Sequence, residues 1–251
     1  MLYKYVGHEN TDEVIKYLKC FIDDGTIYAS QPLSFNDPAE FKVNINFDAT
    51  KEEIRKKYFL DNPKLTEKDF SHWHKNFDDQ AKWYAKYSTR EAFLTRFGTI
   101  CLTRDCNNFL MWSHYARHHT GFCIGFDDSI ADSVDDRSVY GDVNYSTSIP
   151  SIYYFKEGIE KLAKALFLNK GASWAYEQEF RIITNYWGVK KFEKSTIKEV
   201  VLGCRAPAKL QDQLVHLIGT EIQVNKMALS SDHYALKKIA LEKDVYFQGD
   251  A

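Results

Sequence analysis

Two glutamates and an arginine, Glu177, Glu179 and Arg181, alternate within residues 174–184. This spacing predicts a strand on which the three charged side chains share one face, while the apolar residues between them point to the other. Two like charges on an otherwise apolar strand need a partner or a raised pKa. Such a face suits a site that stabilises developing positive charge. The alternative is an ordinary structural ion pair between Arg181 and a glutamate.

The elements that must position this strand follow from the periodicity of the apolar residues. Residues 2–6 predict a short first strand that carries Lys4. A helix is expected from Thr11, as N-cap, to Gly25, because acidic residues occupy its first turn and apolar residues recur at helical spacing. Residues 26–30 predict a second strand. Further strands are expected at 43–47, 99–103, 122–126, 139–145, 197–203 and 221–227, and helices at 107–117, 151–170 and 206–218.

Residues 50–97 differ from the rest, because they are charged, rich in Trp and Tyr, and helical in pattern. We interpret this segment as a helical insertion, which serves either as a lid or partner surface or as a plain helical layer of the same domain. The strands elsewhere form few βαβ units. The pattern therefore predicts a single α+β domain over residues 1–251, with a mixed or antiparallel sheet rather than a doubly wound one.

The composition bounds the class of protein. The chain has 251 residues, 44% of them hydrophobic, and no run of about 18 apolar residues, which predicts a cytoplasmic protein without membrane contact. Five scattered cysteines without a C-x-x-C pair are expected to be free thiols. A net charge of −2 argues against a general grip on nucleic acid, though not against a local basic groove. The 16 Tyr, 17 Phe and 5 Trp provide rings for a flat ligand as well as for the core.

Several established motifs are absent. Neither G-x-G-x-x-G, nor the P-loop pattern, nor G-x-S-x-G occurs, so the enzymes defined by these loops have no support. His114 and His118 lie four apart and could share a helix face as metal ligands. No third ligand is evident, and we therefore expect no metal and assign His114 to a capping or pocket-lining role.

Four motifs in order along the chain resemble a bacterial domain-of-unknown-function family, number 2971. The resemblance covers most of the chain except the helical insertion, and the family name itself implies little chemistry. The motifs are Leu-Tyr-Lys-Tyr (2–5), Ile-Tyr-Ala-Ser (27–30) with Phe-Asn-Asp-Pro (35–38), Met-Trp-Ser-His-Tyr-Ala (111–116) with His-Thr-Gly-Phe (119–122), and Trp-Ala-Tyr-Glu-Gln-Glu-Phe-Arg (174–181).

The order of these motifs also resembles the layout of ADP-ribosyltransferases. That resemblance implies a split mixed or antiparallel sheet in which a first-strand His or Arg binds NAD, a second-strand Tyr or Ser shapes the nicotinamide pocket, and a late Glu contacts the nicotinamide ribose. Carried over by position, these roles fall to Lys4, to Tyr28 or Ser30, and to Glu179, with Glu177 beside it. Lys4 departs from the family pattern, because a lysine lacks the planar fork of arginine.

The resemblance implies a chemistry for the acidic strand. Breaking the bond between nicotinamide and ribose develops positive charge on the sugar, which a carboxylate such as Glu179 stabilises. Glu177 would accept the proton of the incoming nucleophile and Arg181 would orient the carboxylates. The rings of Tyr5, Tyr28 or Trp112 would stack on nicotinamide or adenine.

We therefore expect an NAD-dependent ADP-ribosyltransferase that modifies a protein or nucleic acid, as a toxin or phage-defence effector, with a possible antitoxin partner. Two other classes stay open. One is a nuclease or nucleotide hydrolase that uses His114 and the acidic strand. The other is a non-catalytic nucleotide-binding module in which Arg181 and the glutamates are structural pairs.

Overall fold

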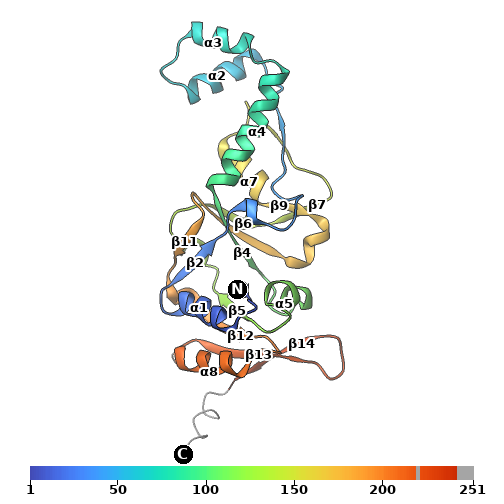
Figure 1. Cartoon of the computed structure of the whole chain (residues 1–251). Coiled ribbons are helices and arrows are strands. Elements are labelled where there is room, and N and C mark those ends of the chain that lie inside the picture. The colour runs from blue at the N-terminus through green and yellow to red at the C-terminus, as the bar shows by residue number, and fades with distance from the viewer. Residues whose placement is uncertain (219–220, 242–251) are drawn as a thin grey trace, which may run out of the picture.

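The computed structural model describes residues 1–218 and 221–241 of the chain. An eight-stranded sheet runs through the body of the molecule (Figure 1). Only β12 and β13 run parallel, while every other neighbouring pair in this sheet is antiparallel, so the expected mixed sheet is confirmed. From edge to edge the strands are β14 (Leu236–Ala240), β13 (Gln223–Leu229), β12 (Ile197–Leu202), β5 (Phe122–Phe126), β1 (Leu2–Val6), β4 (Gly98–Thr103), β10 (Glu179–Thr184) and β6 (Arg137–Asp142).

Helices cover both faces of the sheet near β1 and β5. The helices α1 (Thr11–Ile22) and α8 (Ala208–Leu217) pack on one face through apolar side chains such as Leu18 and Leu214. The short α5 (Phe109–Tyr115) covers the other face with Trp112. The N-cap of α1 is Asn10 rather than Thr11, because the Asn10 side chain accepts the Asp12 N–H at 2.8 Å.

The sheet opens between β1 and β4. These strands share one residue pair, Tyr3 with Thr103, whereas β1 pairs with β5 over its whole length. At the other end of β4, Thr99 exchanges two backbone hydrogen bonds with Ser30, at 2.8 and 2.9 Å. Ser30 follows β2 (Thr26–Ala29), which pairs with β11 (Gly188–Lys191). Cys101 lies between the two paired residues of β4 and therefore borders the opening.

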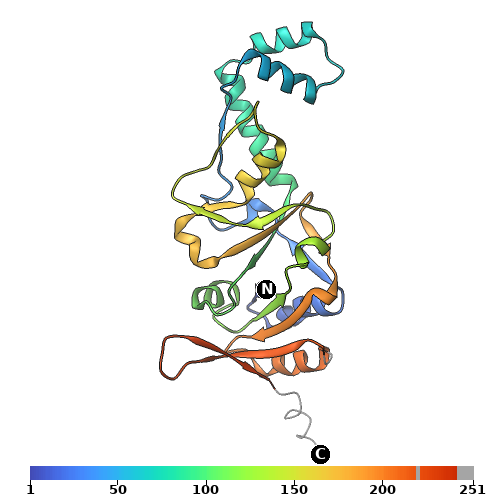
Figure 2. The same cartoon turned by 180° about the vertical axis from the view of Figure 1, so that it is seen from behind.

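Three helices within the predicted insertion form an arm that extends away from the sheet, at the top of Figure 1 and again from behind in Figure 2. They are α2 (Lys51–Asp61), α3 (Glu67–Lys75) and α4 (Asp79–Arg96). Thr50 and Thr66 begin the first two helices, each with a reciprocal capping box. The arm meets the body at a second apolar core, to which β8 contributes Ile152 and α7 contributes Leu166. None of the helices that the structure describes is long and apolar enough to cross a membrane.

The remaining elements lie between the arm and the sheet or connect strands. Two pairs of short strands are parallel, β3 with β8 and β7 with β9. Their bounds and those of the short helices are β3 (Asn44–Asn46), β7 (Asn144–Ser146), β8 (Ser151–Tyr153), β9 (Asn169–Gly171), α6 (Ile130–Ser133), α7 (Ile159–Phe167), η1 (Pro32–Ser34), η2 (Ala172–Glu177) and η3 (Lys194–Thr196).

Two predicted elements are wrong in extent. The predicted helix at 151–170 is β8, a turn, α7 and β9, because the Glu157 carboxylate accepts the Tyr153 N–H and closes a turn before Gly158 begins the helix. The predicted strand at 174–184 starts only at Glu179. It is preceded by η2 and by Gln178, which has a left-handed backbone with φ of 44°.

Candidate functional site

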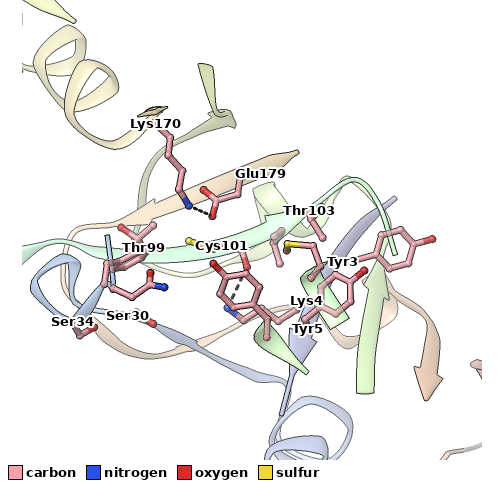
Figure 3. A pocket seen from close by; sticks show the side chains of 15 residues that line it. Tyr3, Lys4, Tyr5, Ser30, Ser34, Thr99, Cys101, Thr103, Lys170 and Glu179 are labelled. Carbon is pink, nitrogen blue, oxygen red and sulfur yellow. Dashed lines mark hydrogen bonds and ion pairs between the residues drawn. The ribbon is translucent and has the colours of Figure 1, made fainter. Parts of the chain in front are cut away.

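A cavity of about 310 Å³ occupies the opening between β1 and β4. In Figure 3, Lys170 and Glu179 lie on one side of β4, and Lys4 and Tyr5 lie on the other. The lining therefore comes from segments far apart in the chain, which the sheet topology brings together. It consists of Tyr3, Lys4, Tyr5, Ser30, Ser34, Phe35, Asn36, Thr99, Cys101, Leu102, Thr103, Met111, Tyr115, Lys170 and Glu179.

Lys4 crosses the opening in the sheet. Its Nζ donates to the backbone carbonyl of Cys101 at 3.2 Å, the carbonyl that no β1 residue pairs with. The Lys4 side chain is half-buried and keeps further N–H donors for an anionic group in the cavity. Lys4 is thus positioned by the separation of β1 from β4, and its charge lies next to the backbone edge of Cys101.

Glu179 is the first residue of β10 and pairs with Thr103 on β4. Its Oε2 accepts from Arg181 Nε at 2.6 Å, and its Oε1 lies 3.4 Å from Lys170 Nζ. The Glu179 backbone N–H donates to the Tyr145 hydroxyl at 2.8 Å. The carboxylate is therefore fixed in place, with one oxygen held firmly and the other loosely, where it borders the cavity.

Glu177 does not share the strand with Glu179, which corrects the prediction, since it ends η2 on the far side of Gln178. Its side chain is fully buried and does not line the cavity. Glu177 Oε2 pairs with Lys170, and its Oε1 accepts the Tyr115 hydroxyl at 2.6 Å. Tyr115 does line the cavity, so Glu177 reaches it only through this tyrosine.

Three further charged residues join Glu177 and Glu179 in a buried group of five, which we call the buried charge cluster. Arg181 is fully buried and donates from Nη2 to Glu40 at 2.9 Å and from Nη1 to the Phe167 carbonyl at 2.9 Å. Lys170 pairs with Glu40 at 2.8 Å. Three carboxylates thus surround two cations, so the cluster carries an excess negative charge. Its members are Glu40, Lys170, Glu177, Glu179 and Arg181.

The two glutamates have opposite pKa shifts. Burial raises the pKa of Glu177 above its ordinary value, although hydrogen bonds from Lys170 and Tyr115 act against this rise. Burial also opposes ionisation of Glu179, but the charges of Arg181 and Lys170 outweigh it and lower the pKa of Glu179. Glu179 is therefore the ionised carboxylate of the cavity, and Glu177 is the one that accepts a proton more readily.

Burial also raises the pKa of two other groups that line the cavity, Tyr115 and Cys101. The pKa of the Tyr115 hydroxyl is raised by burial and by the hydrogen bond to Glu177, so this group is a proton donor to the carboxylate. Burial raises the pKa of the Cys101 thiol in the cavity wall to about 12, which leaves it protonated and a poor nucleophile. All five cysteines are free.

A second cavity, of about 560 Å³, shares part of its wall with the first. Lys4, Tyr5, Ser30 and Tyr115 line both. Tyr28 lines only the second cavity, where its ring is 52% exposed. Lys4 therefore lies where the two cavities adjoin. Of the two second-strand residues, Ser30 lines the same cavity as Glu179, whereas Tyr28 does not.

Three predicted ligand-binding residues lie elsewhere. Trp112 is fully buried and donates its indole N–H to the Cys106 carbonyl at 2.8 Å, so its ring packs in the core. His114 is exposed and lines neither cavity. Arg181 is buried behind Glu179. These positions exclude direct stacking by Trp112 and direct ligand contact by Arg181 in this arrangement.

Sequence reasoning missed three residues of the site, Glu40, Lys170 and Tyr115. Glu40 lies 141 residues from Arg181, and no local spacing connects them. Lys170 was placed at the end of a predicted helix, whereas it belongs to β9. Tyr115 stands inside a recognised motif, but its role depends on Glu177, 62 residues later. Within residues 1–218 and 221–241, no group of three or more His, Cys, Asp or Glu side chains is arranged to hold a metal ion.

Comparison with known proteins gives a match to one family. No curated protein and no solved structure matches the chain. The family model described as Protein of unknown function (DUF2971) matches residues 111–182, a stretch that contains Tyr115, Lys170, Glu177, Glu179 and Arg181. This match confirms the predicted resemblance to domain-of-unknown-function family 2971 over residues 111–182.

Proposed function

We propose that the protein is an NAD-dependent ADP-ribosyltransferase that modifies a macromolecule, as a toxin or phage-defence effector. The observation that carries the proposal is the convergence of Lys4, Ser30 and Glu179 on one cavity. These residues come from three separate segments of the chain, and the motif order assigns them to NAD binding, the nicotinamide pocket and the ribose. The single residue pair between β1 and β4 also supports a sheet that is split at the site.

The setting of Glu179 suits the proposed bond cleavage. When the bond between the nicotinamide nitrogen and the ribose breaks, positive charge develops on the sugar, and a fixed ionised carboxylate stabilises it. Arg181 and Lys170 keep Glu179 ionised by lowering its pKa. Glu179 lines the cavity, and its Oε1 has a contact of 3.4 Å with Lys170 whereas its Oε2 is held by Arg181 at 2.6 Å, so we assign Oε1 to the ribose.

Proton transfer is proposed to pass through Tyr115 rather than directly to Glu177. Tyr115 lines the cavity, and its hydroxyl donates to Glu177 at 2.6 Å. An attacking hydroxyl or amine that gives its proton to the Tyr115 oxygen releases the tyrosine proton to Glu177, whose raised pKa favours acceptance. Glu177 is thus assigned the role of proton acceptor behind Tyr115.

The two adjoining cavities have a size and chemistry that fit a dinucleotide. Ligand pockets generally span about 300–1,000 Å³, and the cavities of about 310 and 560 Å³ meet at Lys4. Lys4 is the cation available to a phosphate there, as a point charge. Tyr28 and Tyr17 line the second cavity and supply aromatic surface for a base.

The test is transfer from labelled NAD. The purified chain is incubated with cell lysate, and label on macromolecules and free nicotinamide are both measured. Glu179→Gln should lower the rate by about 100-fold or more, as expected for loss of a group that acts on transition-state charge. Glu160→Gln, at an exposed helical site, is the matched control and should leave the rate unchanged. Full activity in a folded Glu177→Gln, Glu179→Gln double variant would refute the proposal.

A second candidate, a non-catalytic nucleotide-binding module, is favoured by one observation. Glu179 and Glu177 are both engaged in ion pairs within the buried charge cluster, as structural carboxylates are. Calorimetric binding of NAD with no nicotinamide release would support this candidate over the transferase. The nuclease alternative gains no support from His114, because that side chain lies outside both cavities.

A further inference from the structure

A groove of about 610 Å³ lies between the arm helix α4 and the strands β3 and β8. One wall is the N-terminal half of α4, and the other is formed by the parallel strands β3 and β8 with the residues that follow β3. It shares no lining residue with either cavity of the candidate site. The groove is lined by Asn44, Ile45, Asn46, Phe47, Asp48, Asp79, Lys82, Trp83, Lys86, Ser151 and Tyr153.

Three aromatic rings are exposed on α4, and one of them, Trp83, lines the groove, whereas Tyr84 and Tyr87 lie outside its lining. Trp83 is 65% exposed and lies parallel to Tyr87, with 5.9 Å between ring centroids and 7° between ring planes. Tyr87 and Tyr84 are also more than half exposed, and Tyr153 faces the groove from β8. Large rings exposed together in this way mark a binding surface. A pair of parallel rings offers a flat apolar face on which a further flat ring can stack.

The charges of the groove are mixed, with cations on α4. Lys86 lies over the Phe47 ring at 5.9 Å and forms no ion pair within the part of the chain that the structure describes. Lys82 lies 3.3 Å from Asp79, which is fully exposed, and Asp48 is the other carboxylate of the groove. Residues 51–96 contain 11 Lys and Arg against 8 Asp and Glu, whereas the whole chain contains 33 against 35. The arm therefore carries a net positive charge in a chain whose net charge is −2.

The strand wall of the groove offers hydrogen-bonding groups at the same depth. Asn44, Asn46 and Ser151 lie there, and each amide carries both donors and an acceptor. Asn46 Oδ1 already accepts the Asp48 N–H at 2.7 Å, and this bond does not use the amide N–H donors of Asn46. Amide side chains opposite a stacking ring are the combination that reads the edges of unpaired bases.

From these observations we propose that the groove between α4 and the β3–β8 pair binds single-stranded nucleic acid. A base stacks on Trp83, the amides of Asn44 and Asn46 contact base edges, and Lys86 contacts the phosphate backbone. Stacking on exposed rings beside lysines is sequence-tolerant, so the groove is expected to accept many sequences. The inference rests on the groove alone and does not require that the chain cleave NAD.

The test is fluorescence anisotropy with labelled oligonucleotides of about 12 residues, as single-stranded RNA, single-stranded DNA and duplex. Single strands should bind more tightly than duplex. Trp83→Ala should weaken binding about tenfold, the loss expected for one stacked base. Lys86→Glu should weaken binding and reduce its dependence on salt between about 50 and 200 mM.

Matched controls are available outside the groove, at Trp187 beside the C-terminal end of α4 and at Lys209 on α8. Trp187 is 47% exposed in the turn before β11, and Lys209 is exposed on α8. Trp187→Ala and Lys209→Glu should leave the affinity unchanged. Glu179→Gln should also bind normally, so failure of the transferase proposal and failure of this one are distinguishable.

Three outcomes would overturn the proposal. They are no binding of single strands at low salt, equal losses in the Trp83→Ala and Trp187→Ala variants, and preferred binding of duplex. If nuclease-treated lysate instead yields a protein that is retained by the wild type and released by Trp83→Ala, the groove is a protein interface and the nucleic-acid assignment is wrong.

Discussion

The buried charge cluster and the groove between α4 and the β3–β8 pair differ in how far their side chains are exposed to solvent. Every member of the cluster is at most 6% exposed, whereas Trp83 and Tyr87 of the arm are more than half exposed. In the cluster each charge is held by neighbours from distant segments, so that a substitution affects folding before it affects function. The groove residues Trp83 and Lys86 are exposed, so we expect their substitution to affect binding alone. The two regions therefore require different tests.

The largest expected effect on stability is at Arg181. Arg181→Met leaves Glu179 and Glu40 buried without their guanidinium partner, and we expect a loss of about 3–5 kcal/mol in the free energy of unfolding. Urea denaturation followed by tryptophan fluorescence measures it. Arg137→Met, at a side chain that is 40% exposed and pairs with Asp132, should cost less than about 1 kcal/mol. Equal losses in the two variants would show that burial of the cluster does not increase the cost of removing an ion-pair partner.

A smaller loss is expected at Tyr115. Tyr115→Phe removes the hydroxyl that donates to buried Glu177, and an unsatisfied buried acceptor costs about 1–3 kcal/mol. The matched control is Tyr140→Phe, whose hydroxyl donates to exposed Asp132 at 3.1 Å and whose loss should be close to zero. A stable Tyr115→Phe protein with normal unfolding would mean that Lys170 alone satisfies Glu177.

The two glutamates should give opposite dependences of stability on pH. The pKa of Glu177 is raised from the ordinary 4.5, so its contribution is complete below pH 4.5 and is lost as pH rises through the raised value. The pKa of Glu179 is lowered, so its contribution is present above pH 4.5 and is lost as pH falls through the lowered value. Each group changes the slope by at most about 1.4 kcal/mol per pH unit.

Denaturation at a series of pH values measures these slopes. The wild type should lose stability as pH rises above 4.5 because of Glu177, and Glu177→Gln should abolish this loss. The wild type should also lose stability as pH falls below 4.5 because of Glu179, and Glu179→Gln should abolish that loss. Identical slopes in the two variants would contradict the assignment of opposite shifts.

The smallest expected effect is at Trp83. Its ring is 65% exposed, so Trp83→Ala should change the free energy of unfolding by no more than about 0.5 kcal/mol. The same urea titration applies, with detection by circular dichroism because a tryptophan is lost. A loss above about 1 kcal/mol would mean that the ring stabilises the arm, and the contrast between the two regions would fail.

Elements with strong local signals could be predicted from the sequence. The bounds of strand β1 agree with the prediction for residues 2–6, a short apolar and aromatic run that ends before Gly7. The helical character of residues 50–97 was also confirmed, since its helices begin at Thr50 and Thr66 with local capping boxes. The order of the motifs led us to expect Lys4 and Glu179 in one site. In the structure both residues line the cavity at the opening of the sheet.

Features that depend on distant contacts could not be predicted. Glu40 joins the cluster only through side chains far along the chain, and β14 pairs with β13 without a clear pattern of its own. The prediction that Trp112 stacks on a ligand ring is wrong, because its neighbours in the core come from other segments of the chain, such as Tyr5 and Val201. The apolar spacing of residues 151–170 fitted a helix, and only the turn closed by Glu157 shows why the chain departs from it.

The left-handed Gln178 has a consequence for how this chain is compared with others. In an uninterrupted strand, glutamates two apart would be equivalent positions, but here Gln178 sets them in different substructures. Residue 177 is expected to covary with Tyr115, and residue 179 with Arg181. Two chains can therefore share the sequence Glu-x-Glu and still differ in backbone structure at that point. The sign of φ at the middle residue distinguishes the two cases.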